Sequence, residues 1–218
     1  MLRSTIPMIL IWTVLYGLAY TVPVLYAKSA WVTSISMSIY TGLLITWLIR
    51  TGRSALVRLQ GKRPWNFRDI PDFLPLLLLP VCNLPILTPP PASVVVLMVC
   101  VSMAEELMFR GVLLRFFQRL GNFRSILFSA ILFALFHGVN LIHSGDLIAV
   151  LLQIFCAAGA GFLYGAITLK WNSIFPAMVG HILTNVTGIG SMATPWELVL
   201  CTAVSFLWGI WIYKSNRT

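Results

Sequence analysis

Charged side chains are scarce in this chain, and acidic side chains are the scarcest. Lys, Arg, Asp and Glu together account for 10% of the 218 residues, and only six residues are Asp or Glu. Soluble domains usually contain about 25% charged residues, so this composition excludes an ordinary soluble fold. Because 59% of the residues are hydrophobic, we expect an integral membrane protein whose principal partner is the lipid bilayer.

The sequence also lacks the motifs of several other protein classes. It has neither a CxxC pair nor an HExxH motif, and its cysteines lie singly within apolar stretches, which is typical of packing residues. These are Cys82, Cys100, Cys156 and Cys201. The net charge of +9 comes from basic residues between apolar runs, where the loops of membrane proteins place them. Nucleic-acid binding is not expected, because no soluble module is present to form a basic patch.

Long apolar runs, in contrast, fill most of the sequence. They lie at 6–26, 31–49, 71–90, 93–114, 125–142, 147–169, 173–192 and 197–213. A transmembrane helix needs about 20 residues, so these runs predict an all-α polytopic membrane protein with about eight transmembrane helices in one bundle. Residues 1–218 then form a single transmembrane domain. The run at 71–90 contains repeated prolines, which kink helices, so we expect it to be bent or broken.

The basic residues predict the orientation of these helices. With eight spans and a cytoplasmic N-terminus, most of the 15 basic residues fall on one side, as the positive-inside rule requires of the cytoplasmic side. These are Arg3, Arg50, Arg53, Arg58, Lys62, Arg63, Arg68, Arg115, Arg119, Arg124, Lys170, Lys214 and Arg217. Lys28 lies on the other side. We expect both termini in the cytoplasm and the chain in a plasma membrane, such as the inner membrane of a bacterium.

Three charged residues interrupt the fourth apolar run. Glu105, Glu106 and Arg110 lie within it, although a charged side chain at the bilayer centre costs about 2.5–3.5 kcal/mol on insertion scales. Glu106 and Arg110 are four residues apart, so they can pair along one helical face. A buried ion pair that joins two helices is the structural interpretation. It accounts for Glu106 and Arg110 but leaves Glu105 without a partner, because adjacent residues point in different directions.

Two histidines and an asparagine lie in later runs. His181 and Asn185 share a helical face because they are four residues apart, and His137 ends the segment Phe133-Ala-Leu-Phe-His137. A single histidine of this kind is often a hydrogen-bonded core residue. Counted from the basic end of each helix at 1.5 Å per residue, Glu105 and His181 lie about 15 Å deep and His137 about 20 Å deep. This common depth predicts one shared site, reached from the cytoplasmic half of the bilayer.

These residue types fit the hydrolysis of an amide bond. A carboxylate and an imidazole can activate a water molecule, and a second histidine and an amide can stabilise the oxyanion. No Ser, Thr or Cys lies in a comparable motif, which disfavours a nucleophilic triad. The alternative is a non-enzymatic transporter or scaffold, in which the same residues form an ion-pair or proton-relay network. A transporter is typically built from repeats with paired broken helices, and only the run at 71–90 has that character.

Three motifs occur in order on separate runs. Glu105-Glu106-x-x-x-Arg110, Phe133-x-x-x-His137 and His181-x-x-x-Asn185 together resemble the CPBP family, the CaaX proteases and bacteriocin-processing enzymes also called the Abi family. The likeness covers a motif-bearing core of about residues 93–190. The first half of the chain is similar only in being helical and hydrophobic.

The resemblance implies an eight-helix intramembrane endopeptidase whose cavity opens to the cytoplasmic side. Its catalytic residues would be Glu105 and His137, which activate the water, and His181 and Asn185, which bind the oxyanion. Glu106 and Arg110 would support the site. The family's chemistry is described both without a metal and with one zinc ion, which Glu105, His137 and His181 would bind together with water. The expected cofactor is therefore none or one zinc, and the missing HExxH motif favours the metal-free version.

The resemblance also implies the kind of substrate. Similar prenyl-protein proteases cut near a lipidated C-terminus, whereas bacterial members are linked to peptide maturation, self-immunity against bacteriocins, or sortase-like processing of C-terminal membrane anchors. The expected partner is a membrane-embedded or lipidated protein or peptide that enters sideways between helices.

Overall fold

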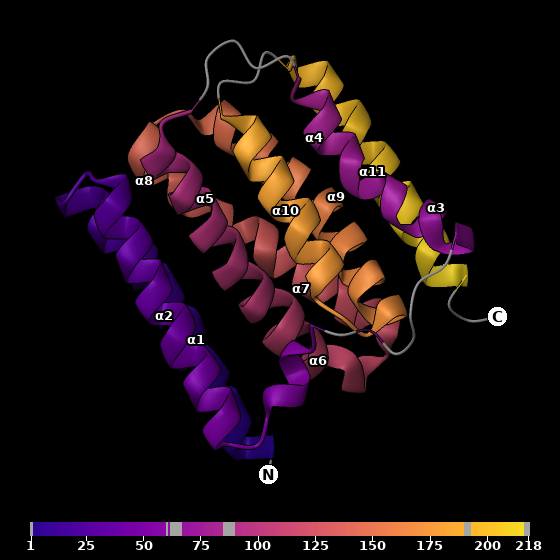
Figure 1. Cartoon of the computed structure of the whole chain (residues 1–218), viewed down its shortest axis with the longest axis horizontal. Helices are drawn as coiled ribbons and strands as arrows, with labels where there is room; N and C mark the ends of the chain where they lie inside the picture. Colours follow the sequence, from indigo (N-terminus) through magenta and orange to yellow (C-terminus); the bar gives the residue numbers. More distant parts are fainter. Residues whose placement is uncertain (1, 60, 62–66, 85–89, 190–192, 216–218) are drawn as a thin grey trace.

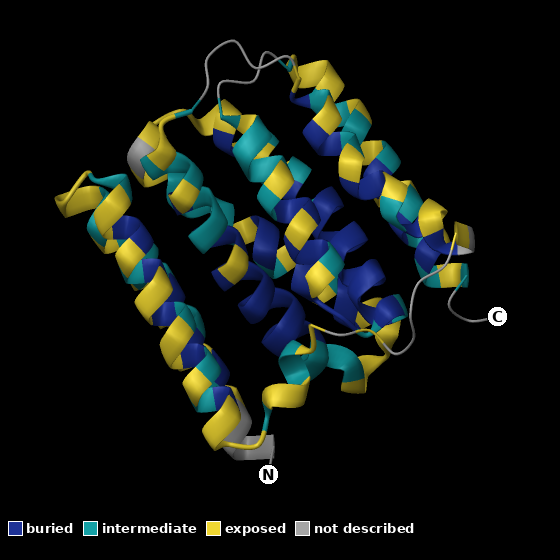
Figure 2. Cartoon of the chain, viewed as in Figure 1, coloured by how far each residue is buried: buried dark blue, intermediate teal, exposed yellow. Residues whose placement is uncertain are grey.

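The computed structural model describes the chain except for residues 1, 60, 62–66, 85–89, 190–192 and 216–218. Every regular element in the described part is helical, which confirms the predicted all-α class. The helices run back and forth as one bundle (Figure 1). Apolar side chains cover much of its outside, whereas the centre is buried (Figure 2). An apolar exterior is what a lipid environment requires.

Six helical segments are long and apolar enough to cross a membrane. They are Ile6–Tyr26, Ala30–Arg50, Ala92–Leu120, Asn122–Asn140, Leu147–Trp171 and Pro195–Ser215. The other two predicted spans are also helical but shorter: Ile70–Cys82 and Phe175–Gly188. The chain is therefore an integral membrane protein with the predicted series of apolar helices, two of which are short for a hydrocarbon core of about 30 Å.

Helices α1 (Leu2–Tyr26) and α2 (Ala30–Arg50) form a pair along one side of the bundle (Figure 1). The Ser29 side chain accepts a hydrogen bond from the backbone N–H of Val32 and caps the start of α2. The inner face of the pair is aromatic, since Trp12, Tyr16 and Tyr40 pack edge to face there. This face places one polar group, the Tyr16 hydroxyl, against the centre of the bundle.

The proline-rich third segment is broken, as predicted. It consists of α3 (Ile70–Phe73), a 3₁₀ turn (Leu74–Leu77) and α4 (Leu78–Cys82). Pro71, Pro75 and Pro80 each lack the N–H that a continuous α-helix needs. Asp72 anchors this segment because its carboxylate accepts hydrogen bonds from Lys170 (2.7 Å) and from the Trp171 indole (3.1 Å). The end of the predicted run, at residues 85–89, lies outside the described residues.

The central helices position the polar residues. Helix α5 (Ala92–Glu105) passes into a π-helical segment (Glu106–Leu113) and then into α6 (Leu114–Phe117). Helix α7 (Asn122–Phe136) is followed by a 3₁₀ turn (His137–Asn140) and the short α8 (Leu141–Ser144). Helix α9 (Leu147–Trp171) packs against α7 and against α11 (Pro195–Ser215), and α10 (Phe175–Gly188) packs against α5.

Small residues on α9 allow its close approach to α7. A Cβ atom on Gly161 would lie 3.1 Å from the Phe133 ring and 3.3 Å from the backbone of Ala130. A Cβ on Gly165 would lie 3.2 Å from Ile126. These small residues on α9 therefore form a helix–helix contact.

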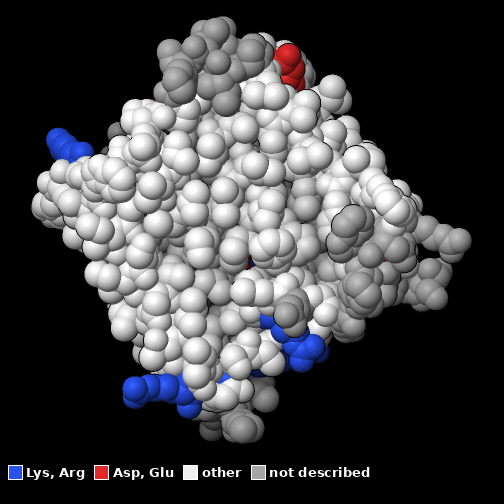
Figure 3. Space-filling view, in the orientation of Figure 1, with Lys and Arg blue, Asp and Glu red and all other residues white. Residues whose placement is uncertain are grey.

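Basic side chains gather at one end of the bundle (Figure 3). This end, called here the arginine-rich end, is formed by the end of α2, the residues from α6 to the start of α7, and the ends of α9 and α11. Its described basic residues are Arg50, Arg53, Arg58, Arg115, Arg119, Arg124, Lys170 and Lys214. At the opposite end lie Lys28, Asp146 and Glu197. The side chains of Arg3, Lys62, Arg63, Arg68 and Arg217 are outside the described part.

Candidate active site

The two adjacent glutamates lie where α5 changes its winding. Glu105 is the last residue of α5 and Glu106 the first of the π-helical segment. Both are buried, with 6% and 0% of their surface exposed. A π-helical turn inside an α-helix is often found at functional sites. The two side chains have different partners, so they are best described one at a time.

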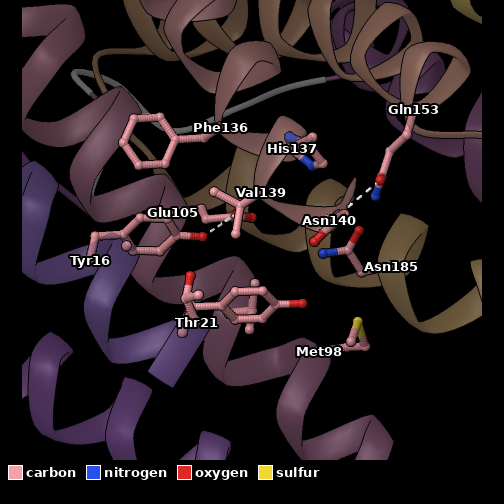
Figure 4. Close-up of a pocket in the computed structure, with 13 residues that line it drawn as sticks. Tyr16, Thr21, Met98, Glu105, Phe136, His137, Val139, Asn140, Gln153 and Asn185 are labelled. Carbon is pink, nitrogen blue, oxygen red and sulfur yellow. Dashed lines mark hydrogen bonds between the residues drawn. The ribbon is translucent and has the colours of Figure 1, made fainter. Parts of the chain in front are cut away.

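Glu105 is held by a residue of the first helix. The Tyr16 hydroxyl donates a hydrogen bond of 2.5 Å to Oε1 of Glu105 (Figure 4). The ring of Tyr16 packs against the rings of Tyr40, Phe109 and Phe136. The hydroxyl therefore has a fixed position. It binds one carboxylate oxygen of Glu105, Oε1, and leaves the other, Oε2, to face the rest of the site.

Glu106 and Arg110 form a fully buried ion pair. Nη1 of Arg110 lies 2.8 Å from Oε1 of Glu106, and neither side chain is exposed. The N–H groups of Arg110 are not aligned for a hydrogen bond with any described residue, so this contact is electrostatic. The guanidinium instead stacks on aromatic rings, 4.1 Å from the centre of Phe133 and 5.4 Å from that of Tyr164. Such cation–π contacts offset part of the lost hydration.

His181 connects the two glutamates. Its Nδ1 lies 2.8 Å from Oε1 of Glu106, and its Nε2 lies 3.4 Å from Oε2 of Glu105. Because a carboxylate only accepts, Nδ1 is the donor. The ring is 3% exposed and is therefore fixed from both sides.

Asn185 extends this network to α5. Its Nδ2 donates to Ser102 Oγ (3.0 Å) and lies 3.1 Å from Nε2 of His181. Ser102 uses its own hydrogen on the carbonyl of Met98, so its oxygen accepts from the amide. In a neutral His181, Nε2 then accepts the second amide hydrogen of Asn185. Both amide hydrogens are thus engaged within the protein.

His137 lies apart from this network but faces the same space. Its Nδ1 lies 2.9 Å from the carbonyl oxygen of Phe133, which can only accept, so Nδ1 carries the hydrogen and Nε2 the lone pair. Nε2 makes no hydrogen bond to a described residue. The ring is partly exposed and lines a cavity together with Glu105.

Two cavities meet at these residues. The first, of about 110 Å³, is lined by residues that include Tyr16, Glu105, His137 and Asn185 (Figure 4). The second, of about 560 Å³, is lined by residues that include His137, His181 and Asn185. His137 and Asn185 line both. The structure therefore brings all four candidate catalytic residues to one junction inside the bundle, with Glu106 and Arg110 packed beneath it.

The comparison with protein families found one match. Residues 87–187 match the family of type II CAAX prenyl endopeptidases described as Rce1-like. The matched segment covers just under half of the chain. No curated protein matches the sequence. Similarity to the Rce1-like family implies a protease, and it favours the enzymatic interpretation over a transporter or scaffold. The matched segment contains the seven residues of the three motifs.

The metal-binding hypothesis for this Rce1-like chain does not fit its geometry. Among the described residues, no group of three or more His, Cys, Asp or Glu side chains could hold a metal ion. Both ring nitrogens of His181 have protein partners, Glu106 and Asn185, so neither is free to bind a metal in this arrangement. Glu105, His137 and His181 therefore do not form a zinc site as they are placed here, and no step below uses a metal.

Tyr16 is the site residue that sequence reasoning missed. It lies outside the segment that matches the Rce1-like family, in an apolar helix with several other aromatic residues. Only its depth in the helix distinguishes it from the other aromatic residues of α1. It lies about 15 Å from the Tyr26 end at 1.5 Å per residue. Nothing in the sequence states which helix lies beside α5, so no pattern could assign it.

Proposed function

We propose that this Rce1-like chain is an intramembrane endopeptidase in which Glu105 and His137 activate a water molecule against a peptide carbonyl. The observation that supports this most strongly is their shared cavity, in which His137 presents Nε2 with its lone pair. Two acceptors on different helices can orient one water molecule between them, which is what general-base catalysis requires.

The proton can then follow a short route. Oε1 of Glu105 accepts from Tyr16, so Oε2 is the oxygen that takes the proton as the water oxygen bonds to the carbonyl carbon. The carbon–nitrogen bond breaks when the tetrahedral intermediate collapses, and Glu105 gives the proton to the leaving amine. One water molecule is consumed and a carboxylate and an amine are released, so the glutamate returns to its starting state.

Asn185 is the proposed donor to the oxyanion. One hydrogen of its Nδ2 lies toward Nε2 of His181 at 3.1 Å, and its side chain lines both cavities. A substrate carbonyl oxygen in the junction would replace that nitrogen as the acceptor. A proton on Nε2 would make His181 a second donor. Glu106 and Arg110 keep the ring in place for this exchange.

The proposed substrate is a segment of a membrane-embedded or lipidated protein or peptide. The second cavity is lined mostly by uncharged side chains and extends along α9 and α10. An extended peptide can therefore lie in this cavity, inside the bundle. CaaX-type processing, removal of a C-terminal anchor and peptide maturation all present such a segment.

The proposal is tested by identifying the new termini that the chain generates. Membrane proteins from cells that contain the wild-type chain would be compared by terminal peptide mass spectrometry with those from cells that contain Glu105→Gln. Glu197→Gln, a change at an exposed glutamate, is the matched control. We expect termini that depend on Glu105 and persist in the control. Identical termini in cells with Glu105→Gln would contradict the proposal.

A further inference from the structure

A pair of amide side chains borders the candidate active site. Asn140 ends the 3₁₀ turn that begins at His137, and Gln153 lies on α9. Nδ2 of Asn140 donates a hydrogen bond of 2.8 Å to Oε1 of Gln153 (Figure 4). Both residues line the first cavity with Glu105 and His137, and Gln153 also lines the second. The pair therefore lies beside the junction of the two cavities, in the cavity of the residues proposed to activate water.

Helix structure does not account for this pair. Asn140 precedes α8 at the position where an asparagine side chain usually accepts a hydrogen bond from a backbone N–H of the helix, but it forms no such bond. Gln153 is exposed and is the only amide side chain of α9. A single hydrogen bond between neutral side chains makes only a modest net contribution to stability. Both side chains are consequently available for another role.

Part of the hydrogen-bonding capacity of the pair is unused. Each amide has two N–H donors and an acceptor oxygen, and the bond between them uses one hydrogen of Asn140 and the oxygen of Gln153. Among the described residues, none forms a hydrogen bond with Oδ1 of Asn140 or with Nε2 of Gln153. An extended peptide presents N–H and C=O groups along its edge. Its N–H can donate to Oδ1 of Asn140, and its C=O can accept from Nε2 of Gln153.

The distance between the pair and His137 sets the part of a substrate that it would reach. A 3₁₀ turn rises about 2.0 Å per residue, so Asn140 lies about 6 Å beyond His137 along the turn. An extended peptide advances about 3.3 Å per residue. A peptide whose scissile carbonyl lies between Glu105 and His137 therefore brings to the pair a peptide group about two residues away. Every residue except proline supplies both the N–H and the C=O for this contact.

We propose that Asn140 and Gln153 form a substrate-binding subsite that holds the main chain of the substrate in an extended conformation, about two residues from the scissile bond. The inference rests on the proposed peptidase function and adds two binding residues to it. It also names a property of the substrate, which is a free backbone N–H at that one position. Proline is therefore excluded there, whereas the side chain of any other residue is not read by the pair.

The subsite is tested first by the kinetics of Asn140→Ala and Gln153→Met in proteoliposomes. The probe is a short synthetic peptide that copies the sequence around a cut found by its dependence on Glu105. Each variant should raise KM by about 3- to 10-fold because one hydrogen bond to the substrate is lost, and kcat should stay the same because the bond is equally present in the transition state. The matched control is Asn122→Ala, since Asn122 also bonds to an amide, Gln118 (3.4 Å), but lines neither cavity. Its KM should be unchanged.

The contact with the main chain is tested by methylating each backbone nitrogen of the probe in turn. We expect one position, about two residues from the cut, at which methylation raises KM for the wild-type chain but causes no further rise for Asn140→Ala. Purely additive effects at every position overturn the inference, as does an unchanged KM in both cavity variants, even if their Tm is lower. In these cases cleavage by the wild-type chain still supports the peptidase function. If no cut depends on Glu105, the peptidase function is rejected and the subsite with it.

Discussion

Replacing Tyr16 with phenylalanine removes a single oxygen atom from the site. That oxygen donates the 2.5 Å hydrogen bond to Oε1 of Glu105, and the packing of the ring against Phe109 and Phe136 stays the same. A hydrogen bond to a charged group contributes about 1.5–3 kcal/mol. Since about 1.4 kcal/mol corresponds to a tenfold change in rate, Tyr16→Phe should lower kcat by about 10- to 100-fold. The reason is that Glu105 no longer has a fixed orientation toward the water.

The assay is cleavage of a membrane peptide by the full-length chain in proteoliposomes, with kcat and KM determined separately. Tyr40→Phe is the matched control, because Tyr40 is also buried and its hydroxyl donates to the Trp12 carbonyl (3.2 Å) instead of to the site. We expect a lower kcat with unchanged KM for Tyr16→Phe and normal kinetics for Tyr40→Phe. Equal losses in both variants would refute a specific positioning role for Tyr16, as would full activity of Tyr16→Phe.

Three further changes have defined outcomes. Arg110→Met leaves the Glu106 carboxylate buried without its cation (0% exposed), which should destabilise the fold by about 3–5 kcal/mol and lower Tm in detergent. Gly161→Ala should lower the free energy of unfolding by about 1–3 kcal/mol, because the added methyl group overpacks the contact with α7. Gly42→Ala is the control: a Cβ atom there has no neighbour within 4 Å, so Tm should stay the same or rise. Asn185→Ala should reduce kcat by about 10²–10³ with a small change in KM, whereas an unchanged kcat would exclude it as the oxyanion donor.

The helices were largely predictable from the sequence because the bilayer imposes their length and polarity. The predicted run at 147–169 and the observed α9 (Leu147–Trp171) nearly coincide, and the prolines of 71–90 indicated the break between α3 and α4. Depth along each helix also placed Glu105, His137 and His181 in one region. Each of these inferences uses only local sequence and the thickness of the membrane.

Other features depend on how the helices pack. The partner of Glu105 is a tyrosine 89 positions away on α1, and no spacing rule connects the two. The π-helical winding of Glu106–Leu113 has no signature in residue types. The direction in which the cavities extend also depends on packing, because depth alone does not reveal which side of Glu105 is filled by side chains such as Phe109.

The central claim is that Glu105 and His137 activate the attacking water. The most direct measurement is the rate of peptide-bond cleavage by purified, reconstituted His137→Ala, compared with that of the wild-type chain under saturating substrate. His137 is partly exposed, and its hydrogen bond within the described part of the chain is to a backbone carbonyl, so the variant should fold normally. The account predicts a fall in kcat of about 10²–10⁴. A variant that cleaves at the wild-type rate would contradict it.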